Sequence, residues 1–175
     1  MLGEGARTNA DAERYEQSYA AAIKAVGADR AASDAHGTSK SGPEGWRSKN
    51  GVSVKLSALH PRYEARQQER VFAELYPRVL RLAELAKRYD IGLTLDAEEA
   101  DRLVLSLKIL EQLAHEPSLA NWAGLGLAVQ AYQKRTRALI ERLVQLARRR
   151  GAPLQVRLVK GAYWDGEIKR AQIMG

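Results

Sequence analysis

The 175-residue sequence contains no cysteine, which excludes a disulfide framework, a thiolate metal site and a cysteine nucleophile. No apolar run approaches the length needed to span a bilayer, and the first residues lack the basic flank and apolar core of a signal peptide. The three histidines, His36, His60 and His115, show no paired metal-ligand spacing. His60 precedes Pro61 and is predicted to be a hydrogen-bonding loop residue. The length suffices for one domain with a real core.

The sequence carries a net charge of +7, and its basic residues concentrate at positions 134–137 and 148–150. A nucleic-acid-binding face is one interpretation of such clusters. Both clusters, however, bracket one amphipathic helix, whose solvated ends commonly carry arginine. Neither is interleaved with the aromatic side chains that a single-strand binding groove uses. We therefore expect that this chain binds no nucleic acid.

Strand and helix patterns alternate along the chain. A capping box at residues 8–11 begins a helix that Gly27 is placed to end, and residues 28–51, rich in Gly and Ser, predict a flexible surface loop. Strands are predicted at 52–58, 91–97, 125–131 and from 155 onward. Helices are predicted between them, over 63–89 with a break near Pro77, after residue 103 and after residue 138, and a last helix starts at residue 165.

This order predicts an α/β fold in which parallel strands are joined by right-handed helical crossovers. It suits either an open doubly wound sheet or part of a (βα)8 barrel. No GxGxxG or Walker sequence follows any predicted strand, which disfavours a Rossmann or P-loop domain.

The segment 155–164 combines a short apolar run with charges at Arg157 and Lys160, and then leaves through Gly161 and two aromatic residues. A parallel strand buried on both faces should be almost entirely aliphatic. The pattern is typical of a strand that ends at a ligand pocket, or of an edge strand with two solvated charges. Tyr163 and Trp164 can stack on a ligand there or pack under the following helix.

Each predicted strand carries polar side chains that a buried strand should avoid, and four of them stand out: Lys55, Asp96, Gln130 and Arg157. Four such residues on successive strands indicate a shared site, because burying them without partners costs several kcal/mol. A structural ion pair between Lys55 and Asp96 is the alternative for those two. In a functional site, Lys55 would face an anion, Asp96 would accept a hydrogen bond from a cation or ring N–H, and Arg157 would suit a planar delocalised anion such as a reduced flavin.

Two other chemistries are less favoured by the pattern. Residues 96–99 could form an acidic metal cluster, but carboxylates before a helix more commonly complement its N-terminus, so no metal site is predicted. A Schiff-base lyase using Lys55 or Lys160 is a further hypothesis, since barrels host such chemistry.

Five segments together resemble the proline dehydrogenase domain of the bifunctional bacterial enzyme proline utilization A. They are residues 1–4 (MLGE), 54–63 (VKLSALHPRY), 96–99 (DAEE), 130–134 (QAYQK) and 157–164 (RLVKGAYW). The resemblance runs nearly end to end and is weakest across residues 28–51.

The resemblance implies a distorted (βα)8 barrel that holds FAD and oxidises L-proline to Δ1-pyrroline-5-carboxylate, passing a hydride to flavin N5 and then electrons to a membrane quinone. It implies that Lys55, Asp96 and Tyr163 line the proline site. It also implies that Gln130 and Arg157 contact the flavin, and that Val159, Gly161 and Trp164 line it.

The resemblance further implies that residues 1–175 are the N-terminal part, about five βα units, of the barrel. Residues 1–4 would end its first strand, and the strands bearing the paired arginines that bind the proline carboxylate would be missing. We therefore expect a fragment of a cytoplasmic parent that also carries an aldehyde dehydrogenase domain and can associate peripherally with the inner membrane. A catalytically inactive truncated chain is the alternative function.

Overall fold

The structure is a computed structural model that describes residues 2–35 and 50–175. Its α-helices and strands follow in the order α1 (Asn9–Ala35), β1 (Gly51–Val54), α2 (Gln68–Glu74), α3 (Tyr76–Arg88), β2 (Gly92–Leu95), α4 (Leu103–His115), β3 (Leu125–Gln130), α5 (Thr136–Arg150), β4 (Gln155–Val159) and α6 (Trp164–Met174). Short 3₁₀ helices η2 (Leu56–Ala58), η3 (Ala65–Gln67), η4 (Ala100–Arg102) and η5 (Pro117–Leu119) lie in the connections. Over these described ranges, no helix is both long and apolar enough to cross a membrane.

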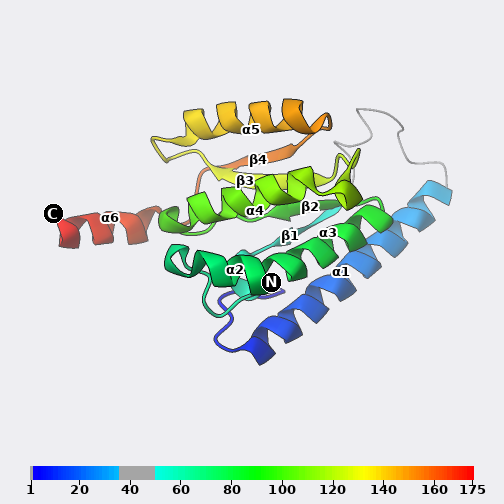
Figure 1. Cartoon of the computed structure of the whole chain (residues 1–175), viewed down its shortest axis with the longest axis horizontal. Coiled ribbons are helices and arrows are strands. Elements are labelled where there is room, and N and C mark those ends of the chain that lie inside the picture. The colour runs from blue at the N-terminus through cyan, green and yellow to red at the C-terminus, as the bar shows by residue number, and fades with distance from the viewer. Residues whose placement is uncertain (1, 36–49) are drawn as a thin grey trace.

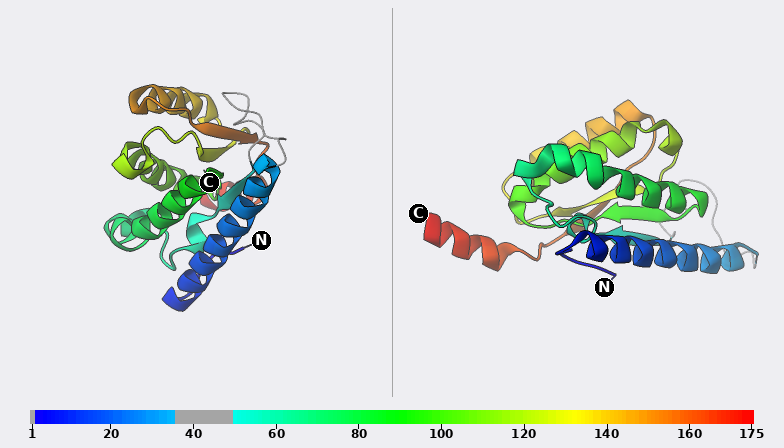
Figure 2. Two further views of the ribbon diagram at one scale, coloured as in Figure 1. Left: turned by 90° about the vertical axis from the view of Figure 1, so that its right-hand side faces the viewer. Right: turned by 60° about the horizontal axis from the view of Figure 1, so that its bottom comes forward.

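The four strands form one parallel sheet in the order β1-β2-β3-β4. Helices α2 to α5 cover one face of the sheet, while α6 projects away from the body (Figures 1 and 2). The alternating α/β order with parallel strands confirms the prediction. Strand β4 lies at the end of the sheet, and its apolar Val156 and Leu158 are 44% and 59% exposed.

The core lies between the sheet and the helices that cover it. Strand β3 is buried along its whole length, and the apolar stripes of the helices meet it. In α3 this stripe comprises Val79, Leu82, Ala83 and Ala86, and in α5 it comprises Leu139, Leu143 and Leu146. The other face of the sheet presents the alternate residues of each strand, because successive side chains point to opposite faces.

The start of α1 confirms the predicted capping box. The Asp11 backbone N–H donates to Thr8 Oγ1 at 3.1 Å, and the Thr8 N–H donates back to Asp11 Oδ2 at 3.0 Å. The predicted end at Gly27 is wrong, because α1 continues to Ala35. A Cβ on Gly27 would lie 2.4 Å from a ring carbon of Tyr89, so this glycine permits close packing rather than a helix stop. Residues 28–35 of the predicted loop are therefore helical, and residues 36–49 lie outside the described residues.

The first predicted strand is shorter than its sequence pattern indicates. Strand β1 ends at Val54, and residues 56–58 form η2, in which all three side chains are buried. The alternation of buried and exposed faces predicted through Ala58 therefore stops at Lys55. Lys55 therefore lies immediately after β1. Strand β2 likewise ends at Leu95, so Asp96 lies immediately after a strand rather than within one.

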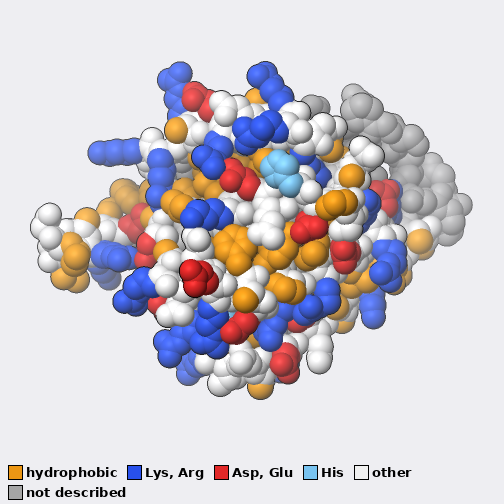
Figure 3. All heavy atoms as spheres, viewed as in Figure 1, with side chains coloured by type: hydrophobic (Ala, Val, Ile, Leu, Met, Phe, Trp, Pro, Cys, Tyr) orange, Lys and Arg blue, Asp and Glu red, His pale blue; other side chains and the backbone are white. Residues whose placement is uncertain are grey.

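The basic clusters flank α5 as predicted, and acidic and basic side chains are intermixed on the face shown in Figure 3. Arg142 pairs with Glu111 of α4 at 2.7 Å. Arg150 donates to the backbone carbonyls of residues 119 and 122 at 3.3 and 3.1 Å. These arginines therefore hold α5 against the neighbouring segments.

Candidate active site at the carboxyl ends of the strands

A cavity of about 260 Å³ opens where the strands end. Its walls are formed by Lys55, Asp96, Ala97, Ala128, Gln130, Arg157, Val159, Gly161, Ala162 and Tyr163. Seven of the eight residues that the sequence singles out for substrate or cofactor are in this set. Because all four strands are parallel, their carboxyl ends lie at one edge of the sheet, which is what brings these residues together.

The Asp96 carboxylate, which follows β2, and the guanidinium of Arg157 in β4 form an ion pair at the carboxyl-terminal edge of the sheet. Nη1 of Arg157 also donates to Ser53 Oγ at 2.6 Å, so the side chain extends from β4 over to β1. The Arg157 side chain is 49% exposed, so this pair contributes little to stability but orients the guanidinium over the cavity. Both interpretations of the 155–164 segment hold in part, since β4 is an edge strand whose Arg157 and Val159 line a cavity.

The predicted alternative of a Lys55–Asp96 ion pair is wrong, because Lys55 Nζ instead contacts Glu4 Oε1 at 2.6 Å. Burial opposes the charge on Lys55, but the bond to Glu4 together with the negative charges of Glu4, Glu98 and the Tyr163 phenol outweighs it, so the pKa of the ammonium group is raised above its ordinary value. Lys55 is therefore a fixed cation at neutral pH. A protonated amine is not nucleophilic, which counts against Schiff-base chemistry at Lys55.

Gln130, the last residue of β3, is 6% exposed and has both ends of its side-chain amide engaged. Its Nε2 donates to the Glu98 carbonyl oxygen at 3.0 Å, and its Oε1 accepts from the Ala162 N–H at 3.2 Å. These bonds fix which end of the amide faces which neighbour. They also tie the segment after β2 to the turn after β4.

Glu98 is a buried residue that the sequence did not reveal as part of this region. It is 7% exposed; its Oε1 accepts from the Ser57 N–H at 3.1 Å, and its Oε2 pairs with Arg102 Nη1 at 3.1 Å. Burial raises the pKa of the Glu98 carboxyl. The i, i+4 spacing of Glu98 and Arg102 was the one available sequence signal.

The acidic run and the histidines make no metal centre in the part of the chain that the structure covers, where no group of three His, Asp or Glu side chains converges. His60 is a buried hydrogen bonder in a loop, as predicted. Its Nε2 lies 3.1 Å from Glu74 Oε2, and its Nδ1 accepts from the Arg62 N–H at 3.0 Å.

The turn between β4 and α6 forms the last wall of the cavity. Gly161 has a φ of +120°, and a Cβ there would lie 2.3 Å from Cδ1 of Tyr132. Tyr163 faces the cavity, and burial raises the pKa of its phenol. Trp164 does not line this cavity. It is 52% exposed and lines a neighbouring groove.

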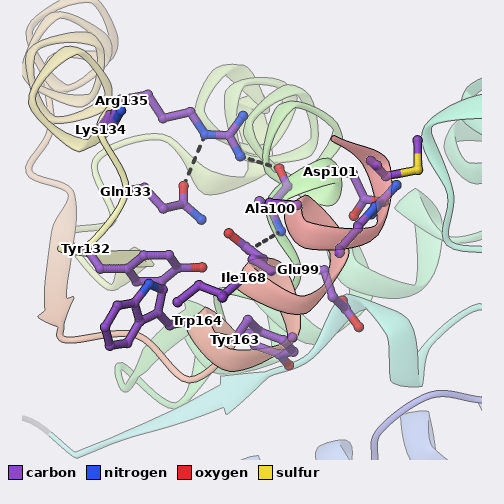
Figure 4. A pocket seen from close by; sticks show the side chains of 15 residues that line it. Glu99, Ala100, Asp101, Tyr132, Gln133, Lys134, Arg135, Tyr163, Trp164 and Ile168 are labelled. Carbon is purple, nitrogen blue, oxygen red and sulfur yellow. Dashed lines mark hydrogen bonds and ion pairs between the residues drawn. The ribbon is translucent and has the colours of Figure 1, made fainter.

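This groove, of about 920 Å³, runs between α6, η4 and the segment after β3 (Figure 4). Figure 4 shows Tyr132 and Trp164 on one side of it. Helix α6 is connected across the groove by two polar contacts. The Ala100 N–H donates to Glu167 Oε1 at 3.0 Å, and Arg170 pairs with Asp101 at 3.1 Å. Tyr163 borders both the groove and the cavity.

Comparison with known proteins shows which family has this arrangement. The family model described as "Proline dehydrogenase" matches residues 1–175. "Bifunctional protein PutA" of Salmonella typhimurium is 55% identical over 175 residues, and that of Escherichia coli is 54% identical; each match covers 100% of this chain and 12% of the relative. "Proline dehydrogenase 1, mitochondrial" of Caenorhabditis elegans is 28% identical over 126 residues, 71% of this chain and 20% of that protein.

Solved structures agree with the sequence matches. A crystal structure of Bradyrhizobium japonicum proline utilization A (PutA), a mutant form, superimposes with a TM-score of 0.85 at 52% identity, covering 98% of this chain and 17% of that one. Proline utilization A from Bdellovibrio bacteriovorus inactivated by N-propargylglycine has a TM-score of 0.82 at 26% identity, covering 98% of this chain and 18% of that one.

These likenesses confirm the predicted α/β fold as part of a proline dehydrogenase barrel. The chain spans about one eighth of the length of the PutA relatives that it matches. Its match to the family model extends over every residue, and the chain therefore belongs to the proline dehydrogenase family.

Proposed function

We propose that this chain contributes the proline and flavin sites of an FAD-dependent proline dehydrogenase, which oxidises L-proline to Δ1-pyrroline-5-carboxylate. The observation that carries the proposal is the convergence of seven predicted site residues on one cavity. Membership of the family supplies the reaction class. Electrons would then pass to a quinone.

The residues around the cavity suit a flavin ring. Gly161 borders the cavity, and its missing side chain lets the Tyr132 ring pack directly against this turn. Arg157 presents a half-exposed guanidinium to this cavity, and Gln130 lines the same cavity with a side-chain amide that is fixed by hydrogen bonds. We propose that these residues and Val159 contact the flavin, and that Trp164 lines it from the adjoining groove. When bound, FAD supplies the hydride acceptor, at N5.

The proposed proline site lies beside the charged residues of the cavity. Lys55 is a fixed cation that can pair with a carboxylate, and Asp96 is a carboxylate that can accept a hydrogen bond from an amine. A tyrosine phenol is protonated at neutral pH, and burial raises the pKa of Tyr163 further, so its hydroxyl can donate to the substrate. These three groups would orient proline rather than transfer a hydride themselves.

The setting of the reaction follows from the PutA relatives, which are named as bifunctional proteins. We propose that this chain is part of a parent enzyme that is likewise bifunctional and carries an aldehyde dehydrogenase domain as its second catalytic domain. We place it in the cytoplasm, with peripheral association with the inner membrane to reach the quinone.

A second candidate is that the 175-residue chain is inactive by itself. Its support is the edge strand β4, on which Val156 and Leu158 are exposed next to the residues proposed to hold the flavin. A flavin site bordered by an open strand should bind weakly, because the ring stays in contact with water.

One assay separates the two candidates. The purified chain is titrated with FAD, and reduction of an electron-accepting dye is then followed with and without proline. Proline-dependent reduction that is lost in Lys55→Met and kept in Arg149→Gln, an exposed change on α5, would support activity and refute the inactive chain. FAD binding without turnover would support the second candidate, and absence of FAD binding would contradict the proposed flavin site.

N-propargylglycine offers an independent probe, since it inactivates the Bdellovibrio relative. Incubation with this amino acid should bleach the FAD absorbance of an active chain, and excess proline should protect against it. A spectrum that does not change in a chain that binds FAD would argue against a shared substrate site.

A further inference from the structure

A second, smaller and more enclosed cavity adjoins the candidate site. Four residues, Asp96, Ala97, Ala128 and Gln130, border both cavities, so they form the wall between them. The inner cavity measures about 10 Å³ and is completed from the helix side by Tyr63, Glu98, Arg102, Leu103, Ser106, Leu127, Gln133 and Leu139. That volume is close to the minimum that accommodates one water molecule.

Tyr63 contributes an unpaired polar atom to this region. The residue is 3% exposed, and its buried hydroxyl oxygen makes no hydrogen bond of good geometry with any described residue, although the Ser106 side chain lies near enough to interact with it. Its ring is held in place, because the Arg102 guanidinium carbon lies 5.5 Å from the ring centroid. Ser106, another residue of the cavity wall, donates its own proton to the Leu103 carbonyl at 2.9 Å. A buried hydroxyl in a folded protein is nearly always paired, with protein or with ordered water.

The cavity wall contains further polar groups with unused capacity. Gln130 Nε2 carries two N–H groups, of which one donates to the Glu98 carbonyl. The Glu98 carboxylate accepts from Ser57 and Arg102 and retains lone pairs. A buried water needs two to four polar partners, and this wall offers them together with the Tyr63 hydroxyl.

We propose that this inner cavity binds a single ordered water molecule, paired with the Tyr63 hydroxyl, and that Tyr63 acts through this water as a positioning residue for Gln130. The role at Gln130 deepens the proposed function, because Gln130 is there assigned to the flavin. The water site itself depends only on the cavity, the Tyr63 hydroxyl and its neighbours.

The change in the thermal unfolding midpoint caused by Tyr63→Phe tests the proposal, because its sign depends on whether the water is present. Removing a hydroxyl that is bonded to a water leaves that water short of a partner, so the midpoint should fall, by about 2–4 °C for a chain of this length. Removing a hydroxyl that is buried in a dry cavity removes an unpaired polar group, so the midpoint should stay or rise. The control is Tyr76→Phe, whose hydroxyl donates directly to Glu116 and lies away from both cavities. A midpoint for Tyr63→Phe at or above that of the unmodified chain would overturn the proposal.

A high-resolution crystal structure of the chain gives the direct test. An ordered water within hydrogen-bond distance of Tyr63 Oη is expected, and a dry cavity would overturn the proposal. The positioning role is read from the side-chain NH₂ resonances of Gln130 in NMR spectra. These should shift in Tyr63→Phe and not in Tyr76→Phe, and unchanged resonances would remove the positioning role.

Flavin affinity is measured last, because it alone depends on the proposed function. The FAD dissociation constant should rise roughly two- to tenfold in Tyr63→Phe, as expected for one neutral hydrogen bond. If the unmodified chain fails to bind FAD, the proposed flavin site fails, while the structural and stability tests still decide the water site. If the chain binds FAD and Tyr63→Phe binds it equally well, the positioning role is overturned.

Discussion

One added methyl group at Gly161 would test the candidate site at its most constrained point. Gly161 follows β4 and borders the cavity between Val159 and Ala162. Its φ of +120° lies where L side chains are rarely found, and its missing Cβ would lie 2.3 Å from the ring of Tyr132. Gly161→Ala therefore imposes backbone strain and a steric clash together.

The magnitude follows from these two terms. A non-glycine residue held in such a backbone region costs about 1–3 kcal/mol. Crowding a packed site with an extra carbon costs about 1–3 kcal/mol more, and less where the neighbour can move. Because Tyr132 is only partly buried, its ring can shift, and we expect a total loss of about 2–4 kcal/mol in unfolding free energy. The turn would have to move, and Ala162 would lose its bond to Gln130.

Urea denaturation of the variant measures this loss, with FAD titration alongside. The matched control is Gly166→Ala in α6, where a Cβ meets no atom within 4 Å. That change should stabilise the helix by about 0.5–1 kcal/mol. Adding Tyr132→Ala to Gly161→Ala should relieve the steric clash but not the backbone strain. Part of the loss in unfolding free energy should therefore remain in the double variant. A Gly161→Ala chain as stable as the unmodified one would refute the reasoning about this turn.

Three further changes have defined outcomes. Arg157→Lys should weaken FAD binding at least about tenfold, as for the loss of a charged hydrogen bond, which fluorescence titration measures. The same change should alter the unfolding free energy in urea melts by less than about 1 kcal/mol, because the ion pair with Asp96 is exposed. Burial raises the pKa of Glu98 above its ordinary 4.5, so the folded chain retains a proton that the unfolded chain loses just above that pH. The stability of the unmodified chain relative to Glu98→Gln should therefore fall as pH rises above 4.5, and urea melts at a series of pH values showing the opposite slope would contradict this. Thr8→Ala removes the N-cap of α1 and should cost about 1 kcal/mol in thermal melts, and a melt unchanged from the original would show that the cap contributes nothing.

The fold was predictable because its evidence is local. Helix and strand differ in the spacing of apolar residues, and α3, β3 and α5 each carry that spacing without interruption. Gly27 misled the prediction because its role depends on Tyr89, a residue that only the tertiary structure brings close. The end of β1 was misplaced because η2 buries consecutive residues, which an alternating pattern cannot distinguish from a strand.

The residues of the candidate site could be predicted from the sequence, but the hydrogen bonds and ion pairs between them could not. Lys55, Asp96, Gln130 and Arg157 stood out because polar residues are unusual in parallel strands. Their partners did not, since pairing depends on geometry that the strand pattern does not contain. Glu98 was overlooked for the same reason, because it stands in an acidic run that resembles an ordinary helix start.

The charges around the cavity suggest why a zwitterion suits it. Each cation at the site is already matched by one carboxylate, Lys55 by Glu4 and Arg157 by Asp96. An anion alone would have to compete with one carboxylate, and the displaced carboxylate would lose its partner. A ligand that carries both a carboxylate and an amine, as proline does, can pair its carboxylate with a cation and its amine with a carboxylate, so no charge is left unpaired. Because a ligand with both charges leaves every group paired, this matching favours an amino acid over a simple carboxylate.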